Sequence, residues 1–457
     1  MNLPAEIFRA YDIRGIVGRT LDESIARAVG RAIGTLSLER GARAVVVGRD
    51  GRLSGPALAT ALGEGVAAAG ADVIDVGMVP TPVAYFASHQ LDAGSCAMVT
   101  GSHNPPEYNG IKMVVAGDAL SGDEIQGLRT LAQSGPLRSG AGKRSHADVL
   151  DDYVQRIAGD IRLARKMKIA IDCGNGVAGL IATRLFRALG CEVEELFCDV
   201  DGTFPNHHPD PSQPKNLADL VQALARGDAE IGLAFDGDGD RLGVVTKDGE
   251  VIFPDRQLML YAADVLSRNP GAEIIYDVKC TRLFAPWVER HGGRATIWKT
   301  GHSLVKAKLK ASGAPLAGEM SGHTFFKERW YGFDDALYTG ARLLEIVSKA
   351  SDANAVLKAL PNAPCTPELN WKLEEGEPHA LVARLQAAKP FPGAARIVDI
   401  DGVRVEYADG FGLARASNTT PVIVLRFEGD TPEAMKRIQE SFRAALQPLK
   451  PGAPLPF

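Results

Sequence analysis

The sequence lacks any apolar run close to the roughly 18 residues that a helix needs to cross a bilayer. Its N-terminus has no signal-peptide core, because charged residues stand where an apolar stretch is required: Glu6, Arg9, Asp12 and Arg14. A large excess of either charge is also absent, since 51 Lys and Arg against 56 Asp and Glu leave a net charge of −5. No whole-molecule field therefore draws the protein onto nucleic acid or an anionic membrane. We expect a cytoplasmic protein without nucleic-acid or membrane partners, which meets any anionic ligand with a local basic site.

Cysteines are few, and their spacing is not that of a metal site. The six show neither a CxxC pair nor a Cys/His zinc pattern: Cys96, Cys173, Cys191, Cys198, Cys280 and Cys365. In a chain of 457 residues this distribution predicts reduced thiols, most of them buried.

Length and internal repeats indicate several α/β domains. A chain of this length predicts about three domains. A β-branched run, a polar turn, an amphipathic helix that ends at glycine and a second strand recur three times, with first strands beginning near Val45, Ile169 and Ile274. Alternating strands and helices predict mainly parallel sheets covered by helices on both faces. We therefore predict three related α/β domains, whose repeated helices end at Gly70, at Gly190 and at Gly292 and Gly293.

The C-terminal part of the sequence follows another pattern. After about residue 363 it shows a helix-like HALVARLQAAK, a hairpin around Asp401 and Gly402, a glycine-rich loop, the strand PVIVLRFEG and a final amphipathic helix. This order predicts a smaller α+β domain. Polar or proline-bearing joints place the four domains at residues 1–147, 148–250, 251–362 and 363–457.

In each of the three repeats, a third apolar segment leads into a polar loop that contains glycine. These segments are SCAMVTGSHNPP, IGLAFDGDGD and PLAGEMSGH. Open α/β sheets bind ligands beyond the carboxyl ends of their strands, so we expect the three loops to line one central site.

The strongest chemical signal is the run of alternating Asp and Gly at residues 236–240, directly after an apolar strand. Two carboxylates about 6 Å apart repel by roughly 3 kcal/mol at an effective dielectric of about 20, so three of them favour a bound cation such as Mg²⁺ or Ca²⁺. An EF-hand fits poorly, because its sixth and twelfth positions would be Arg241 and Lys247. The alternative is the nucleophilic loop of haloacid-dehalogenase-type phosphatases, which requires Thr or Val where this chain has Asp240.

Ser102 lies in a second motif, TGSHNPPEYNG at residues 100–110, between Gly101 and His103 at the end of a strand. The chain has no GxSxG esterase elbow. Together with a divalent-metal loop and the nearby Lys112, the motif favours a serine that accepts and donates a phosphoryl group, with the metal as Lewis acid.

Three further motifs are candidates for ligand binding. GNGVAG at residues 174–179 matches a dinucleotide fingerprint, with Asp199 downstream, but a tight strand-to-helix turn explains these glycines equally well. GEMSGH at residues 318–323 offers Glu319 and Ser321 as hydrogen-bond partners and His323 as a general base. ARASNTTP at residues 414–421 groups a guanidinium, hydroxyls and an amide, a set that can hold a phosphate dianion.

Taken in order, these motifs resemble those of the α-D-phosphohexomutase superfamily, most closely its bacterial phosphomannomutase/phosphoglucomutase group. YDIRG at residues 11–15, TGSHNPPEYNG, DGDGDR, GEMSGH and RASNTT stand where that family has its N-terminal, phosphoserine, metal, sugar and phosphate loops. The resemblance spans the chain. It implies three related α/β domains with mixed or parallel sheets and a smaller C-terminal α+β domain around a central cleft. Met320 and Thr100 favour this group over the phosphoglucosamine mutases.

The resemblance also implies roles for individual residues. It makes Ser102 the phosphoserine and adds as catalytic residues Arg14, His103, Lys112 and His323. The expected metal is Mg²⁺, bound by the phosphate on Ser102 and by Asp236, Asp238 and Asp240. The residues implied in substrate binding are Tyr11, Arg241, Lys279, His302, Glu319, Ser321, His323, Arg415, Ser417, Asn418 and Thr419.

The activity that the resemblance implies is reversible phosphoryl transfer between O1 and O6 of glucose and mannose phosphates. Phosphorylated Ser102 would give its phosphoryl group to a hexose 1-phosphate, forming a hexose 1,6-bisphosphate that turns over and returns its other phosphate. A hexose phosphate is the expected partner, and a monomer the expected assembly, with a dimer as the alternative. A non-catalytic sugar-phosphate sensor would use the same pocket yet lack a phosphorylated serine.

Overall fold

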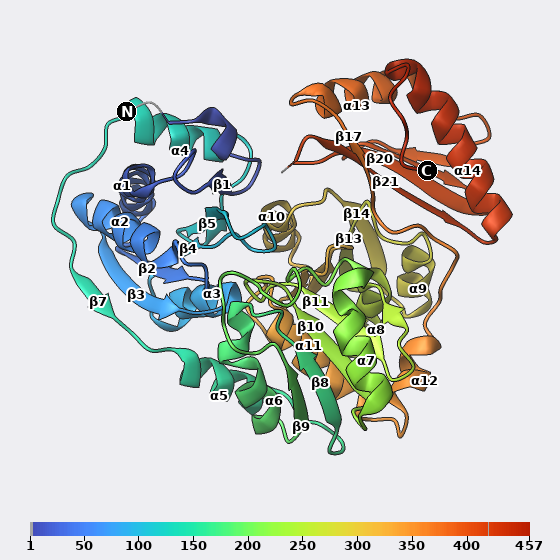
Figure 1. Ribbon diagram of the computed structural model, residues 1–457, viewed down its shortest axis with the longest axis horizontal. Helices are drawn as coiled ribbons and strands as arrows, with labels where there is room; N and C mark the ends of the chain where they lie inside the picture. The colour runs from blue at the N-terminus through green and yellow to red at the C-terminus, as the bar shows by residue number, and fades with distance from the viewer. Residues whose placement is uncertain (1–2, 419) are drawn as a thin grey trace.

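The computed structural model describes residues 3–418 and 420–457, which form four sheets with helices packed against them (Figure 1). We call the sheets and their helices, in chain order, domains I to IV. Within the described residues, no helix is long and apolar enough to span a membrane. All six cysteines are free thiols, and four of them are buried, as predicted.

Domain I contains a seven-stranded sheet in the order β1-β5-β4-β2-β3-β7, with β6 paired to β5. Its strands are β1 (Ile13–Ile16), β2 (Ala44–Arg49), β3 (Asp72–Met78), β4 (Gly94–Val99), β5 (Tyr108–Val115), β6 (Asp118–Ala119) and β7 (Arg144–His146). Its helices are η1 (Ala5–Ile7), α1 (Glu23–Glu39), α2 (Gly55–Ala68), α3 (Thr81–Gln90) and α4 (Asp123–Ser134).

Domains II and III contain sheets of five and four strands. Domain II comprises α5 (Leu150–Asp160), β8 (Lys168–Asp172), η2 (Val177–Leu180), α6 (Ala182–Ala188), β9 (Glu192–Leu196), η3 (Pro214–Leu217), α7 (Ala218–Arg226), β10 (Ile231–Phe235), β11 (Leu242–Thr246) and β12 (Val251–Ile252). Domain III comprises α8 (Pro254–Arg268), β13 (Glu273–Asp277), α9 (Phe284–Arg290), β14 (Arg294–Trp298), α10 (His302–Ser312), β15 (Leu316–Gly318), β16 (Thr324–Phe326), α11 (Ala336–Val347) and α12 (Ala353–Lys358).

Domain IV has an antiparallel five-stranded sheet in the order β17-β21-β20-β19-β18. Its elements are β17 (Leu369–Lys372), α13 (Glu377–Ala388), β18 (Arg396–Val398), β19 (Val403–Tyr407), β20 (Gly410–Ala416), β21 (Val422–Gly429), α14 (Pro432–Leu446) and η4 (Gln447–Leu449). It lies next to domain III, in orange and red in Figure 1.

The first three domains share one arrangement of four strands. The orders are β3-β2-β4-β5, β9-β8-β10-β11 and β14-β13-β15-β16. In each, the first three strands are parallel and the fourth is antiparallel to the third. The prediction of three related α/β domains is therefore confirmed. The loop between the third and fourth strands occupies the same position in every copy, and these are the three loops that the sequence singled out.

The predicted helix ends agree with the backbone. Gly70, Gly190 and Gly292 follow α2, α6 and α9 with φ angles of 95°, 91° and 78°. This left-handed region is readily available to glycine, so the three residues let the chain leave the helix and enter the next strand.

The prediction of a glycine-rich loop before the strand at 421–429 is wrong, because residues 410–416 form strand β20. A Cβ atom on Gly410 would lie 2.2 Å from the carbonyl oxygen of Glu428 on β21. A Cβ atom on Gly412 would lie 2.4 Å from the ring of Phe442 on α14. These glycines make room for close packing within the sheet and against the helix.

The apolar core consists of several clusters, and the largest of them joins domains I to III. One continuous cluster includes Phe86 of domain I, Phe186 of domain II and Leu258 of domain III. Domain IV has its own cluster, which includes Trp371 and Phe442. Domains I to III thus share one packed cluster, domain I has a second cluster that includes Leu62 and Ile111, and domain IV has a separate core.

Buried arginine side chains of domain IV donate hydrogen bonds to domain III. Arg404 Nη1 donates to Val278 O at 2.8 Å and to Cys280 O at 2.6 Å. Arg426 Nη1 donates to Asp255 Oδ2 at 2.9 Å. Val278 also belongs to a small apolar cluster with residues of β20.

Candidate active site

Ser102 lies in the loop at residues 100–107, the serine loop, which joins β4 to β5. Its Oγ lies 3.1 Å from Asp236 Oδ2 and 3.1 Å from His103 Nδ1. The φ angle of Ser102 is 49°, a left-handed conformation that is costly for a residue other than glycine. Burial, and after it the charge of Arg241, lowers the pKa of His103 well below its usual value. This shift favours the neutral imidazole, which can accept a hydrogen bond from the Ser102 hydroxyl.

The three aspartates of residues 236–240, the aspartate loop, converge between β10 and β11. Oxygen atoms of their carboxylates lie within 4.8 Å of one another, and all three side chains are buried. Asp236 Oδ1 accepts hydrogen bonds from the backbone N–H groups of residues 239, 240 and 241. Burial, and after it the charges of Asp240 and Asp238, raises the pKa of Asp236 well above its usual value. Among the described residues, Asp238 Oδ1 finds no hydrogen-bond partner. This buried, unpaired oxygen beside two more carboxylates fits a hard divalent cation.

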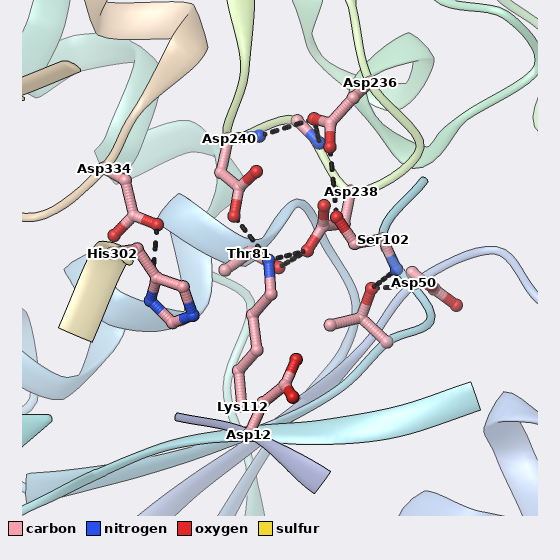
Figure 2. Close-up of polar contacts among 12 residues, drawn as sticks. Asp12, Asp50, Thr81, Ser102, Lys112, Asp236, Asp238, Asp240, His302 and Asp334 are labelled. Atoms are coloured by element: carbon pink, nitrogen blue, oxygen red, sulfur yellow. Dashed lines mark hydrogen bonds and ion pairs between the residues drawn. The ribbon is translucent and has the colours of Figure 1, made fainter. Parts of the chain in front are cut away.

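Lys112 on β5 extends from domain I to the aspartate loop, where its ammonium lies between Asp238 and Asp240 (Figure 2). Its Nζ donates to Asp238 Oδ2 at 2.8 Å and also to Asp240 Oδ2. Burial acts to lower the pKa of Lys112, but the two carboxylates outweigh burial and raise it. The ammonium group therefore stays charged, and it can offset negative charge on a phosphoryl group next to it.

Arg14 and Tyr11 complete the domain I side of the site. Arg14 on β1 donates from Nη1 to the carbonyl oxygen of Gly101 at 2.7 Å, and its Nε is buried without a hydrogen-bond partner among the described residues. The ring of Tyr11 meets His302 edge-on, with 4.9 Å between the ring centroids. Since His302 begins α10, this contact joins domain I to domain III.

His323 connects the domain III loop, residues 319–323, to the aspartate loop. Its Nδ1 lies 2.9 Å from Glu319 Oε2 and 3.0 Å from Ser321 Oγ. Its Nε2 lies 3.3 Å from Asp240 Oδ1. Burial acts to lower the pKa of His323, but Asp240 and Glu319 outweigh burial and raise it to about 9.

Two cations lie at the domain IV side of the site. Lys279 Nζ donates to Glu368 Oε1 at 2.6 Å. Arg415, at the end of β20, donates from Nε to Asp401 Oδ2 at 3.0 Å, and its buried Nη2 has no hydrogen-bond partner within the described chain. Ser417 and Asn418 follow Arg415 directly, while Thr419 lies outside the described residues.

These side chains surround one cavity of about 240 Å³. Of the predicted site residues that the structure describes, all line this cavity except the three aspartates of the aspartate loop, which contact Ser102 and Lys112 instead. The cavity is lined by Tyr11, Arg14, Ser102, His103, Lys112, Arg241, Lys279, His302, Glu319, Ser321, His323, Arg415, Ser417 and Asn418.

Polar lining residues that were not predicted include Asp12, Asp210, Gln213 and Glu368. Asp12 stands inside the YDIRG motif, so this motif could have pointed to it. The other three lie in irregular connections after β9 and before β17, where no local pattern distinguishes a lining residue from a solvated one.

Comparison with known families follows the same division into four parts. Family descriptions of phosphoglucomutase/phosphomannomutase alpha/beta/alpha domains I, II and III match residues 5–137, 151–249 and 253–363, and the C-terminal domain of the same family matches residues 368–445. The chain belongs to the phosphoglucomutase/phosphomannomutase family.

Relatives in this family are similar to the chain over its whole length. A phosphoglucomutase of Neisseria meningitidis is 57% identical over 449 residues, which are 98% of each protein. A phosphomannomutase/phosphoglucomutase of Pseudomonas putida is 55% identical over 456 residues, covering 100% of this chain and 98% of the relative. The crystal structure of a phosphoglucomutase/phosphomannomutase family protein from Burkholderia thailandensis covers 100% of both chains with a TM-score of 0.95 and 60% identity. These comparisons confirm the predicted membership of the α-D-phosphohexomutase superfamily. They also confirm the prediction that the protein is an isomerase.

Proposed function

We propose that this family member interconverts the 1-phosphates and 6-phosphates of glucose and mannose, with Ser102 as the phosphoryl carrier. The observation that carries the proposal is the position of Ser102 Oγ, 3.1 Å from both Asp236 Oδ2 and the neutral imidazole of His103. The hydroxyl thus lies between an acidic cation site and a group that can take its proton. The Pseudomonas putida relative carries both activities in its name, which supports this choice of substrates.

Asp236, Asp238 and Asp240 would hold Mg²⁺ together with an oxygen of the phosphate on Ser102. When bound, the ion supplies positive charge that polarises the phosphoryl group. Lys112 contacts two of the same carboxylates from the domain I side. Its ammonium and the guanidinium of Arg14 keep positive charge near Ser102 while the phosphoryl group arrives or leaves.

We propose a hexose 1,6-bisphosphate as the intermediate. Phosphorylated Ser102 transfers its phosphoryl group to the free O6 or O1 of the bound sugar phosphate. The sugar hydroxyl loses its proton as its bond to phosphorus forms, and Ser102 Oγ gains a proton as its bond to phosphorus breaks. In the reverse step His103 Nδ1 accepts the Ser102 proton. Lys279 and Arg415 would hold the phosphate that does not react, so each end of the sugar must in turn reach the same cations.

This double orientation restricts which hydroxyl groups can be recognised. Glu319 and Ser321, on the domain III loop, would bind O3 and O4, because a sugar that turns over presents these two hydroxyls in both orientations. Glucose and mannose differ only at O2. A site that reads O3 and O4 should therefore turn over both sugars.

The test is ³¹P NMR of glucose 1-phosphate and mannose 1-phosphate, each incubated with the protein, Mg²⁺ and a trace of the matching 1,6-bisphosphate. We expect 6-phosphate from both sugars, with kcat/KM values within about tenfold, since binding through shared hydroxyls gives little discrimination. A preference above about a thousandfold would contradict the dual specificity. Binding of either sugar phosphate without isomerisation would contradict the mutase and indicate a sensor.

A further inference from the structure

Arg52 is a buried arginine beneath the serine loop. It follows β2, is 1% exposed and does not line the active-site cavity. Its guanidinium has five N–H donors, and each has an acceptor. The acceptors are Ser102 O at 2.8 Å, Asn104 O at 2.6 Å, Pro105 O at 2.6 Å, Tyr108 O at 2.9 Å and Asp50 Oδ2 at 3.2 Å. Four of the five are backbone carbonyls of the serine loop and of the residue that begins β5.

Asp50 extends this contact to the backbone around Ser102. Its Oδ2 accepts from Thr100 Oγ1 at 2.8 Å and from Gly101 N at 3.1 Å. Thr100 Oγ1 in turn accepts from Ser102 N at 2.8 Å. The left-handed backbone of Ser102 is thus held from its N–H side by Thr100 and from its carbonyl side by Arg52.

The loop and the guanidinium fit closely. A Cβ atom on Gly101 would lie 2.3 Å from Arg52 Cζ, so only glycine fits above the guanidinium plane. Domain II also contributes a contact, because Arg52 Cζ lies 5.2 Å from the ring centroid of Phe204. Phe204 has a φ angle of 51°, a strained conformation for a bulky residue that the surrounding packing must hold.

We infer that Arg52 is the positioning residue for the phosphoryl carrier: by binding four carbonyls it holds the serine loop so that Ser102 Oγ meets Asp236. The inference rests on the proposed role of Ser102. Arg52 acts through the backbone and touches neither Ser102 Oγ nor the cavity. A lysine cannot replace it, because an ammonium group has three donors and no planar fork.

The test uses full-length Arg52→Lys and Arg52→Ala. We expect kcat to fall by about 100-fold, as for a misplaced reacting group. KM should stay within about threefold, because Lys279 and Arg415 are untouched. Amide hydrogen exchange of residues 100–108 should become faster in both variants. Millimolar guanidinium should restore kcat of Arg52→Ala by about tenfold, and methylammonium should not, because only the planar fork binds four carbonyls.

The matched control is Arg342→Lys, which changes a fully buried arginine of domain III that binds Asp264 and Glu328. It should lower Tm and leave kcat unchanged.

The inference is overturned if folded Arg52 variants keep wild-type kcat, if the hydrogen exchange of residues 100–108 is unchanged, or if their loss of activity only follows the loss of Tm, as for a purely structural arginine. If the wild type neither isomerises sugar phosphates nor carries phosphate on Ser102, the proposed function fails, while the exchange measurement still tests the hold on the loop.

Discussion

At the scale of single residues, the site contains buried charges that need a partner of opposite charge. Asp236, Asp238 and Asp240 are all buried, and Lys112 is the cation that touches two of them. Removing one partner of such a group leaves an uncompensated charge in a low-dielectric interior, which costs far more than losing an exposed ion pair. Under the proposed function, stability and catalysis therefore depend on the same side chains.

Replacing Lys112 with Met should lower the free energy of unfolding by about 3 kcal/mol, because Asp238 and Asp240 lose their counter-charge. Urea unfolding followed by circular dichroism measures the change. The control is Lys310→Met, which removes an exposed lysine paired with Asp118 and should cost about 0.5 kcal/mol. Equal effects of the two substitutions would show that Lys112 does not compensate the aspartate loop.

Asp335 should make stability depend on pH. It caps α11 by accepting from Tyr338 N at 2.9 Å and also accepts from Tyr153 Oη at 2.7 Å. Burial raises its pKa to about 7, against the opposing effect of these hydrogen bonds. Between the usual carboxyl pKa and 7, the folded protein therefore binds a proton that the unfolded chain has lost. This contribution to stability is greatest at low pH and disappears as the pH rises through 7.

The measurement is urea unfolding of the wild type and of Asp335→Asn at pH 5 and pH 7. On going from pH 5 to pH 7, the wild type should lose roughly 2 kcal/mol relative to the variant. An identical difference between the two proteins at both pH values would show that Asp335 does not titrate in this range.

At the scale of elements, the site is built from the same loop used three times. The repetition of three domains could be predicted from the sequence, because hydrophobic periodicity and glycine-ended helices recur locally. In the structure, the strand order repeats with them. The serine loop, the aspartate loop and the domain III loop follow β4, β10 and β15, the third strands of the shared arrangement. Residues of the three loops line one site or contact residues that line it.

Other features at this scale could not be predicted, because they depend on contacts between distant segments. Gly410 and Gly412 have the local appearance of a loop, and only the positions of β21 and α14 explain them as strand residues. Glu368 pairs with Lys279 across the junction of domains III and IV, and no motif surrounds it. Arg52 lies far from Ser102 in the chain, and its role is visible only once the serine loop is folded over it.

Gly237 lies where the aspartate loop packs closely against the serine loop. A Cβ atom at this position would lie 2.4 Å from the carbonyl oxygen of Ser102. Gly237→Ala should therefore push the aspartate loop away from the serine loop and lower kcat by about 100-fold.

The control for Gly237→Ala is Gly127→Ala, in the middle of α4, where a Cβ meets nothing within 4 Å. This substitution should raise the free energy of unfolding by about 0.5–1 kcal/mol and leave kcat unchanged. If Gly237→Ala keeps wild-type kcat, the two loops do not need their close contact for activity.

For the whole molecule, the important division lies between domains I to III and domain IV. The first three share a continuous apolar core, whereas domain IV has its own. The sequence indicated a different C-terminal unit through its change of pattern, but the sharing of one core by the other three domains depends on how their surfaces meet.

Domain IV should therefore open or unfold separately from the rest. In hydrogen exchange at low urea concentrations, peptides from residues 369–446 should lose protection before peptides from β8, β10 and β13 do. Simultaneous loss of protection in all four domains would contradict this, and would show that the contacts of Arg404 and Arg426 join domain IV to domain III as one cooperative unit.

The central claim is that Ser102 carries the phosphoryl group, and intact-mass spectrometry tests it most directly. The protein is measured before and after incubation with glucose 1,6-bisphosphate and Mg²⁺, beside Ser102→Ala and the control Ser145→Ala, whose serine lies on β7 outside the cavity. We predict a mass difference of one phosphoryl group between the two states of the wild type and of Ser145→Ala, and none for Ser102→Ala. A wild type that never shows this difference, or a Ser102→Ala variant that still does, would contradict the account.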